Sequence, residues 1–378
     1  MAEERPSVGI WRWTMAFTGV GSTMLGPFLP RLLVLWPIQD RQAGMLVASL
    51  FLGSFSGTIS MSRQLDRCLR RGALAASIGC LGFAAAAHFR NGFGAALLAL
   101  LLMGFGMGQL MSSINLLVGA APPAQRVRQL ALLGAAWCAG AVLSPSVSTV
   151  LLRGISPSLR LVLLAFLFLL PLFALRQTAW GTRESAFEHS DDRHGLLADG
   201  VLLCTLMFLI YGGIEASISA WTPLFATRYA AGPIAASQWI LSLFWSGLIL
   251  GRMALGAFSG SGTESLVYGA AGASVLLLLW LTLSGSFVRI AIGTVLLGGC
   301  VSPLFPLLLA TTLEYKYSNR VMGIVLASCA LGSALFPLLM GFLSSSFSLR
   351  AGMMLPVAGL LTLVAVRWGL RPRMQVAL

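Results

Sequence analysis

Glu215 is an acidic side chain deep within an apolar run that extends from about residue 196 to residue 226. Burying an ionised side chain at the centre of a bilayer costs at least about 2.5–3.5 kcal/mol, so an acid in such a run needs a function or a partner. Its carboxyl group can load and release a proton, or accept hydrogen bonds from sugar hydroxyls. The alternative is a structural acid that bonds to backbone groups freed at Gly212 and Gly213.

Two aromatic residues flank this acid. Tyr211 precedes Glu215 by four positions and therefore shares its face of a helix. Trp221 follows six positions later, about 240° around an ideal helix, unless the glycines and Pro223 break the helix. An aromatic ring beside a carboxylate suits a sugar, because the ring packs on C–H groups while the acid binds hydroxyls. A tryptophan at this position is also typical of the aromatic belt at a membrane surface.

A second polar set falls in the apolar run from about 94 to 119. Gln109, Ser112 and Ser113 are three and four positions apart and form one face of a helix. Asn115 lies six positions after Gln109. These side chains are candidates for binding a polar solute, and hydrogen bonding between neighbouring helices is the other explanation.

The composition indicates a membrane protein. Of the 378 residues, 57% are hydrophobic and 10% are charged, whereas soluble domains carry roughly 25% charged residues. The mean hydropathy is +0.86. A helix needs about 20 apolar residues to cross a bilayer, and runs of this length recur along the chain. We predict an all-α membrane protein with twelve transmembrane helices at 13–36, 42–62, 72–89, 94–119, 129–152, 160–175, 197–226, 236–258, 265–284, 289–313, 321–345 and 351–369.

The basic residues predict the orientation. With both termini in the cytoplasm, 17 of the 25 Lys and Arg residues lie on the inner side, in agreement with the positive-inside rule. We therefore expect an integral protein of a bacterial inner membrane with cytoplasmic termini. The net charge of +13 reflects this topology and contact with anionic membrane lipids. Because the arginines are scattered over short loops, we expect no nucleic-acid partner.

The sequence offers little for metal or cofactor chemistry. The six cysteines form no CxxC pair, and we interpret them as small packing residues, with Cys68 in a cytoplasmic loop. The chain has no GxxxxGK[ST] motif for ATP. We expect no catalytic residue, no metal site and no cofactor. An enzyme is disfavoured, because no cluster of His, Asp, Glu and Cys falls within the predicted helices.

A polar stretch at 176–196 divides the chain into two halves. We predict that it is a cytoplasmic linker between a six-helix bundle at 1–175 and a second one at 197–378. Internal repeats of this kind are common in transporters, which bind their substrate near mid-membrane between the repeats.

The two halves repeat each other in sequence. The matching pairs, at offsets of 192 to 194, are Gly19 and Gly212, Gly104 and Gly298, Gly140 and Gly332, and Pro145 and Pro337. In this register Glu215 corresponds to Ser22. The acid is therefore a feature of the second half alone and not of the shared scaffold.

The stretch after the second predicted helix reads GTISMSRQLDRCLRRGAL. It resembles the signature loop of the major facilitator superfamily, in which a glycine precedes an Asp-Arg pair and further arginines. The resemblance covers nearly the whole chain and implies secondary transport, with a charged conformational latch in which Asp66 pairs with arginines and a helix N-terminus. A simple basic loop that sets the topology is the alternative. The latch positions, with one counterpart in the second half, are Gly57, Asp66, Arg67, Arg70, Arg71 and Arg252.

Three stretches narrow the resemblance to the fucose-permease-like branch, which contains sugar carriers, several of them proton symporters. They read YGGIEASISAW, FWSGLILGR and SPLFPLLLATT. Fucose permease is expected to carry acids in helices 1 and 4, and the corresponding stretches here have none. The fifth predicted helix carries GAVLSP, a partial match to a motif of drug–proton antiporters.

These features predict a secondary transporter of a small polar organic solute, a sugar in the first instance, with proton coupling as an option. The alternatives are an exporter of amphipathic or drug-like compounds by proton antiport and a transport-inactive membrane sensor. The expected partners are the solute, protons and membrane lipids, and we expect a monomer. The candidates for solute binding or proton coupling are Glu215, Tyr211, Trp221, Gln109, Asn115 and Ser112.

Overall fold

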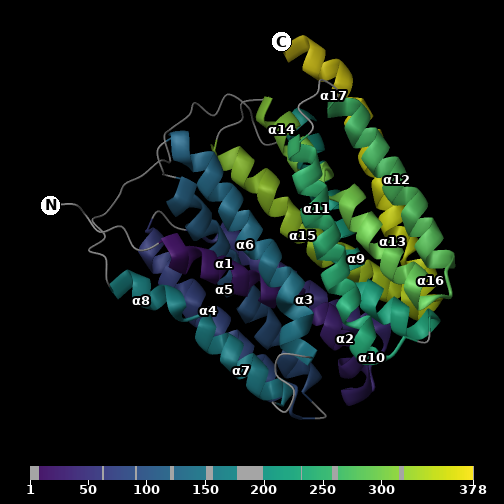
Figure 1. Ribbon diagram of the computed structural model, residues 1–378. Helices are drawn as coiled ribbons and strands as arrows, with labels where there is room; N and C mark the ends of the chain where they lie inside the picture. The colour runs from purple at the N-terminus through teal and green to yellow at the C-terminus, as the bar shows by residue number, and fades with distance from the viewer. Residues whose placement is uncertain are drawn as a thin grey trace. The chain divides into compact units, whose positions relative to one another are not determined.

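The computed structural model describes residues 8–61, 64–89, 92–119, 123–149, 156–176, 199–230, 232–257, 263–314 and 319–377. Every regular element within these ranges is an α-helix, and the helices number seventeen (Figure 1). In chain order they are α1 (Val8–Thr23), α2 (Leu25–Leu35), α3 (Asp40–Ile59), α4 (Leu65–Ala86), α5 (Phe93–Gly119), α6 (Pro123–Thr149), α7 (Pro157–Leu167), α8 (Leu170–Arg176), α9 (Asp199–Tyr229), α10 (Ile234–Ser237), α11 (Trp239–Ala257), α12 (Thr263–Leu283), α13 (Phe287–Val301), α14 (Leu304–Glu314), α15 (Asn319–Ser346), α16 (Leu349–Gly352) and α17 (Met354–Ala377).

Several of the helices combine into longer segments. Each of the pairs α1/α2, α7/α8, α10/α11, α13/α14 and α16/α17 is separated by only one or two residues and corresponds to one predicted span. The helices of the described residues thus form twelve segments, which confirms the predicted all-α architecture. Within the part of the chain that the structure describes, eight helices are long and apolar enough to cross a membrane, and shorter apolar helices lie at Leu132–Pro145, Ser158–Phe173 and Trp239–Leu255.

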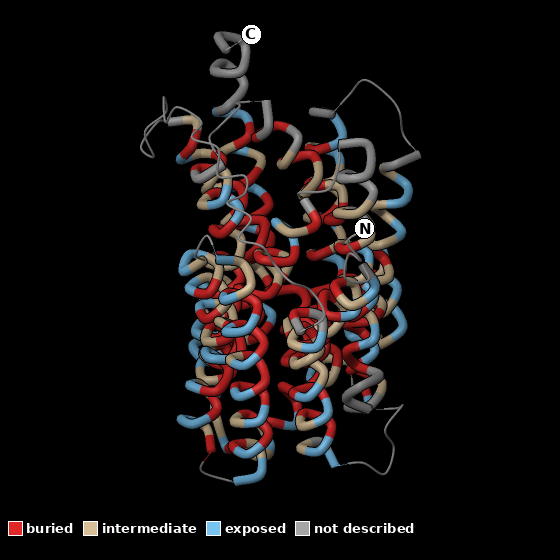
Figure 2. The backbone as a smooth tube through the Cα atoms, turned by 90° about the vertical axis from the view of Figure 1, so that its left-hand side faces the viewer, coloured by how far each residue is buried: buried red, intermediate tan, exposed pale blue. Residues whose placement is uncertain are grey.

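The surface of the helices agrees with a lipid environment. Buried and exposed residues alternate along the same helices (Figure 2). Many exposed side chains are large and apolar, and they include Leu98, Phe166, Leu276 and Leu283. A soluble monomer rarely exposes so much apolar surface, whereas the hydrocarbon core of a bilayer solvates it.

The expected boundary before the third span is wrong. The sequence predicts that this span begins at residue 72, but α4 begins at Leu65. The charged residues Asp66, Arg67, Arg70 and Arg71 of the signature stretch therefore lie in the first two turns of a helix. Cys68, expected in the same loop, is fully buried in α4. Long basic side chains at a helix end extend toward the interface, so hydropathy alone ends such a span too early.

The chain divides into two compact units. Unit 1 comprises Met1–Ile38 and Ser49–Glu188, and unit 2 comprises Gln39–Ala48 and His189–Leu378. The helix α3 contributes to both, because residues 40–48 belong to unit 2 and the remainder to unit 1. The predicted linker lies outside the described residues except for Arg176, which ends α8.

In unit 1, α1 packs along α6 through two glycines. A methyl group on Gly19 would overlap the backbone carbonyl oxygen of Trp137, and one on Gly140 would overlap that of Ala16. Small residues allow helix backbones to approach closely in a membrane, where no hydrophobic force drives helices together.

In unit 2, α9 packs along α15 in the same way (Figure 1). Gly212 lies against the backbone carbonyl of Cys329, and Gly332 lies against that of Leu209. These four positions are the counterparts of the four in unit 1, at offsets of 192 and 193. The sequence repeat is therefore also a repeat of helix contacts.

Candidate functional site

The helix α9 is continuous from Asp199 to Tyr229, although Pro223 lies within it. Because the helix does not break, Tyr211 and Glu215 lie on one face, and Trp221 is turned away by about 240°. The structure thus brings two of the three predicted residues together and leaves Trp221 on another face.

Tyr211 and Glu215 are hydrogen-bonded. The Tyr211 hydroxyl donates to Oε2 of Glu215. Tyr211 is 1% exposed, whereas Glu215 is partly exposed. The neighbouring glycines serve packing instead of freeing backbone groups, since Gly212 meets Cys329 and Gly213 meets the Phe336 ring within an unbroken helix.

An aromatic ring lies beside this pair, and a cation lies within electrostatic range of it. Phe305 lies in the first turn of α14, directly after the interruption between α13 and α14. Its ring centroid is 5.4 Å from that of Tyr211 and 5.5 Å from that of Phe208. Arg252 of α11 interacts electrostatically with both Tyr211 and Glu215. A carboxylate, a hydroxyl, a ring and a guanidinium of unit 2 can together bind a polar solute or stabilise either charge state of the acid.

Trp221 is fully buried, which argues against a place in an aromatic belt at the membrane surface. Its Nε1 has no hydrogen-bond partner among the described residues, and neither has the buried Oγ of Ser217, one helical turn before it. A buried donor without an acceptor costs about 1–3 kcal/mol.

The polar face of α5 contacts the end of α3 and the residues directly after it. Gln109 donates from Nε2 to Oγ of Ser60 over 3.2 Å, and Ser112 donates to Oγ1 of Thr58 over 3.3 Å. Ser113 lies against the sulfur of Met61. These contacts favour hydrogen bonding between helices for Ser112 and Ser113.

Two members of this set keep unused hydrogen-bonding capacity. Gln109 is 1% exposed, and its Oε1 has no hydrogen-bond partner within the described part of the chain. Asn115 is exposed near the end of α5. Gln109 and Asn115 therefore remain candidates for contacting a solute from unit 1.

The first-half latch residues lie in α3 and at the start of α4. A methyl group on Gly57 would overlap the carbonyl oxygen of Phe105, so close contact of α3 with α5 requires glycine here. Asp66 lies in the first turn of α4, where a negative charge complements the helix dipole. The three arginines Arg67, Arg70 and Arg71 are exposed. The side chains at 123–128, which begin α6, lie outside the described part, so the pairing of Asp66 with arginines of a neighbouring helix stays a prediction.

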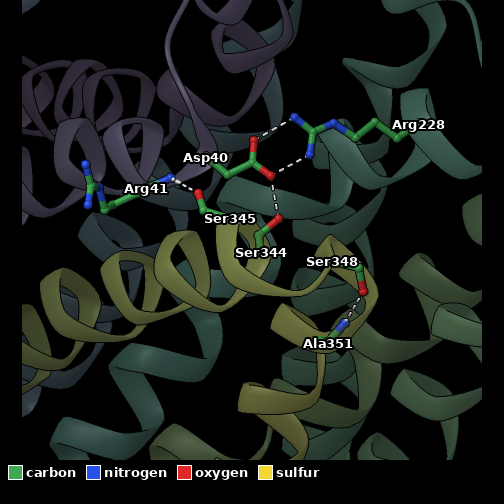
Figure 3. Close-up of polar contacts among 7 residues, drawn as sticks. All are labelled: Asp40, Arg41, Arg228, Ser344, Ser345, Ser348 and Ala351. Carbon is green, nitrogen blue, oxygen red and sulfur yellow. Dashed lines mark hydrogen bonds and ion pairs between the residues drawn. The ribbon is translucent and has the colours of Figure 1, made fainter.

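The structure also shows an ion pair that the sequence did not predict. Arg228, in the last turn of α9, binds Asp40, in the first turn of α3, through two parallel contacts of 2.5 and 2.6 Å (Figure 3). The hydroxyl of Ser344, in the last turn of α15, donates to the same carboxylate. Asp40 is 7% exposed. Arg228 and Ser344 are 188 and 304 positions away from Asp40 in the sequence, so no local pattern could reveal the contact.

The described residues contain no group of three or more His, Cys, Asp and Glu side chains that could hold a metal ion. All six cysteines lie within described helices, and four of them are buried. The chemistry of the candidate site therefore rests on the carboxylate, hydroxyl and guanidinium groups named above.

Comparison with known proteins identifies the family. The family described as the Major Facilitator Superfamily matches residues 13–316. The glucose/mannose transporter GlcP of Bacillus subtilis (strain 168) is 28% identical over 161 residues. That match covers 42% of this chain and 38% of the relative, well under half of each.

Solved structures support the fold. A bacterial homologue of the human lysosomal transporter Spinster has a TM-score of 0.78 at 13% identity, over 100% of this chain and 99% of that chain. The xylose transporter XylE from E. coli has a TM-score of 0.75 at 13% identity, over 94% of each chain. The peptide transporter POT has a TM-score of 0.76 at 14% identity, over 98% and 95% of the two chains. The family match, the twelve helical segments and the whole-chain structural likeness agree, and the chain belongs to the major facilitator superfamily of integral membrane transporters.

Proposed function

We propose that this transporter moves a small polar organic solute, a sugar, across the membrane by alternating access. The observation that carries the proposal is the Tyr211–Glu215 pair, with the Phe305 ring beside it and Arg252 within electrostatic range. A sugar offers hydroxyl groups for the carboxylate and C–H groups for the ring. The partial likeness to a glucose/mannose transporter supports the same solute class.

We propose Glu215 as the residue that binds the solute or carries a coupling proton. An acid in an apolar helix is costly to keep ionised, so its charge state depends on whether its surroundings are open to water. Alternating access changes those surroundings in each transport cycle. Proton symport follows if Glu215 loads its proton on one side of the membrane and releases it on the other.

The proposed topology places both termini in the cytoplasm of a bacterium and the protein in the inner membrane. The six-helix bundles would be 1–175 and 197–378, joined by a cytoplasmic linker at 176–196. This arrangement puts Asp66 and its neighbouring arginines on the cytoplasmic side, where we propose that they stabilise one conformation of the transporter.

Counterflow in proteoliposomes tests the solute class. Vesicles loaded with one unlabelled compound are diluted into a trace of the same labelled compound, for a panel of hexoses, pentoses, organic acids and amphipathic cations. We expect counterflow with at least one sugar and none in protein-free vesicles. Counterflow with amphipathic cations and with no sugar would contradict the proposal and favour the exporter.

Labelling by an impermeant maleimide tests the topology. The background lacks the six native cysteines, and single cysteines replace Ser185 in the linker or Ser286 in the loop between α12 and α13. We expect Ser286→Cys to react in intact cells and Ser185→Cys to react only in inverted vesicles. The reverse pattern would overturn the proposed orientation.

A further inference from the structure

The helix α3 is held at two places, and the two differ in kind. Its start, residues 40–48, belongs to unit 2, and the remainder belongs to unit 1. A helix shared in this way cannot follow both units if they move relative to each other. One of its two attachments has to give way.

The attachment of α3 to unit 1 is a close backbone contact. Methyl groups on Gly53 and Gly57 would overlap the carbonyl oxygens of Leu101 and Phe105 on α5. On α5, Gly104 meets the backbone of α3 at Leu50 in the same manner. These backbone contacts extend over several turns, and side-chain hydrogen bonds from Ser112 to Thr58 and from Gln109 to Ser60 join them only at the end of α3.

The same backbone contact recurs in unit 2 between α11 and α13. Gly247 and Gly251 lie against the carbonyls of Val295 and Gly299. Each of these positions follows its counterpart on α3 or α5 by 194 residues. This contact is therefore part of the scaffold that both halves share.

The attachment of the start of α3 to unit 2 includes an ion pair, which has no such duplicate. The Asp40 carboxylate accepts hydrogen bonds from both guanidinium nitrogens of Arg228 and from the Ser344 hydroxyl (Figure 3). Beside it, the Arg41 backbone N–H donates to Oγ of Ser345 over 2.8 Å. At the offset of 194, the counterpart of Asp40 is Ile234, which cannot form an ion pair.

The charges suit the helix ends that carry them. Asp40 lies at the positive N-terminus of α3, and Arg228 lies at the negative C-terminus of α9. The Arg228 side chain is 37% exposed, so water reaches the pair and can solvate both charges when they separate. A bidentate pair of this kind is specific in geometry and yet reversible.

A narrow backbone contact lies beneath the ion pair. A methyl group on Gly341 of α15 would lie 2.5 Å from the backbone oxygen of Asp40, and one on Gly44 of α3 would lie 2.8 Å from that of Pro337. The first turns of α3 thus fit α15 closely enough for the carboxylate to reach Ser344.

We propose that Asp40, Arg228 and Ser344 form a releasable lock that fastens the start of α3 to unit 2 and must open in each transport cycle. The proposal rests on alternating access as the proposed function. It assigns the moving attachment of α3 to residues 40–48 and the fixed one to the glycine contact with α5.

Hydrogen exchange of the protein in lipid nanodiscs tests the lock without any solute. Asp40→Asn and Arg228→Gln each break the ion pair. We expect the amides at 44–48 and 341–346 to exchange about tenfold faster in either variant, while those at 53–59 keep their rate. The amides at 40–43 are left aside, because the first turn of a helix lacks internal acceptors. Unchanged exchange at 44–48 would contradict the lock.

Arg289→Gln is the matched control, since Arg289 is an exposed arginine of α13 and its loss removes the same charge. We expect wild-type exchange at 44–48 in this variant. An equal acceleration there would show a general charge effect and would overturn the proposal.

The exchanged pair, Asp40→Arg with Arg228→Asp, separates the lock from simple damage to the fold. We expect it to restore at least part of the slow exchange at 44–48 that either single variant loses. No recovery in a double variant with wild-type thermal stability would contradict the pairing. A transporter that moves no sugar but shows these exchange patterns would refute the proposed solute and leave the lock intact.

Discussion

The helix pairs α1/α6 of unit 1 and α9/α15 of unit 2 share their backbone contacts and differ in their polar residues. Each pair is packed through two glycines whose contacts match at offsets of 192 and 193. At the positions that correspond to Tyr211 and Glu215, unit 1 has Thr18 and Ser22. Thr18 donates within its own helix to Met15, so no hydroxyl–carboxylate pair exists there.

The glycine contacts are common to both units, whereas the polar pair Tyr211 and Glu215 is found in unit 2 alone. In the proposed alternating-access mechanism, both halves benefit from the same helix packing, because each has to stay rigid while the other moves. A polar solute needs only one set of specific groups, and a second set would add the cost of burial without a use. The repeat therefore preserves the glycines and leaves the acid to one half.

The largest effect, a loss of stability, is expected at the glycine contacts that the two helix pairs share. Gly140→Ala and Gly332→Ala each place a methyl group on a backbone carbonyl, so each should destabilise its unit by about 3 kcal/mol, the upper part of the usual range for overpacking. Thermal unfolding in detergent measures this. Gly134→Ala on α6 and Gly323→Ala on α15 are the controls, since both positions have open space. A large loss in only one of the two units would mean that the packing is not equivalent.

A smaller effect, on solute affinity or uptake, is expected at Tyr211, where the two helix pairs differ. Tyr211→Phe removes the hydroxyl that donates to Glu215 and keeps the ring against Phe305. A hydrogen bond to a charged group contributes about 1.5–3 kcal/mol, so solute affinity or proton-driven uptake should fall at least roughly tenfold. Thr18→Val should leave both nearly unchanged. Equal losses in the two variants would remove the asymmetry on which the proposed function depends.

The smallest effect is expected at Asp66, which we place in the conformational latch and not in solute binding. Losing a negative charge from the first turn of α4 costs about 0.3–1 kcal/mol. Asp66→Asn should therefore slow turnover about two- to fivefold in counterflow, with equilibrium binding of the solute intact. Asp66→Glu, which keeps the charge, should retain the wild-type rate. A large loss of affinity in Asp66→Asn would count against the latch.

The sequence predicted the helices well, because a transmembrane span depends on one local property, the length of an apolar run. It also predicted the Tyr211–Glu215 pair, since a spacing of four positions puts both residues on one face of any helix. The start of α4 was missed where local hydropathy and helix geometry disagree, at the arginines of its first turns.

The sequence could not predict contacts between segments that lie far apart along the chain. Asp40 looked like a loop residue before a helix, and nothing near it indicates Arg228 or Ser344 as partners. The burial of Trp221 was missed for a related reason: whether a tryptophan near a helix end faces lipid or another helix depends on the neighbours that tertiary packing supplies. Such features need the positions of several helices at once.

The most direct test of the central claim is solute transport by Glu215→Gln in proteoliposomes, measured beside Ser22→Ala in the matching position of the other half. Glutamine keeps the size and hydrogen-bonding capacity of the acid but cannot titrate. If Glu215 carries the proton, Glu215→Gln should lose accumulation driven by a proton gradient and keep counterflow. If it binds the solute, affinity should fall roughly ten- to a hundredfold, the cost of a charged hydrogen bond of about 1.5–3 kcal/mol. Ser22→Ala should keep both activities. Wild-type accumulation and affinity in Glu215→Gln, with only a lower thermal stability, would contradict the account.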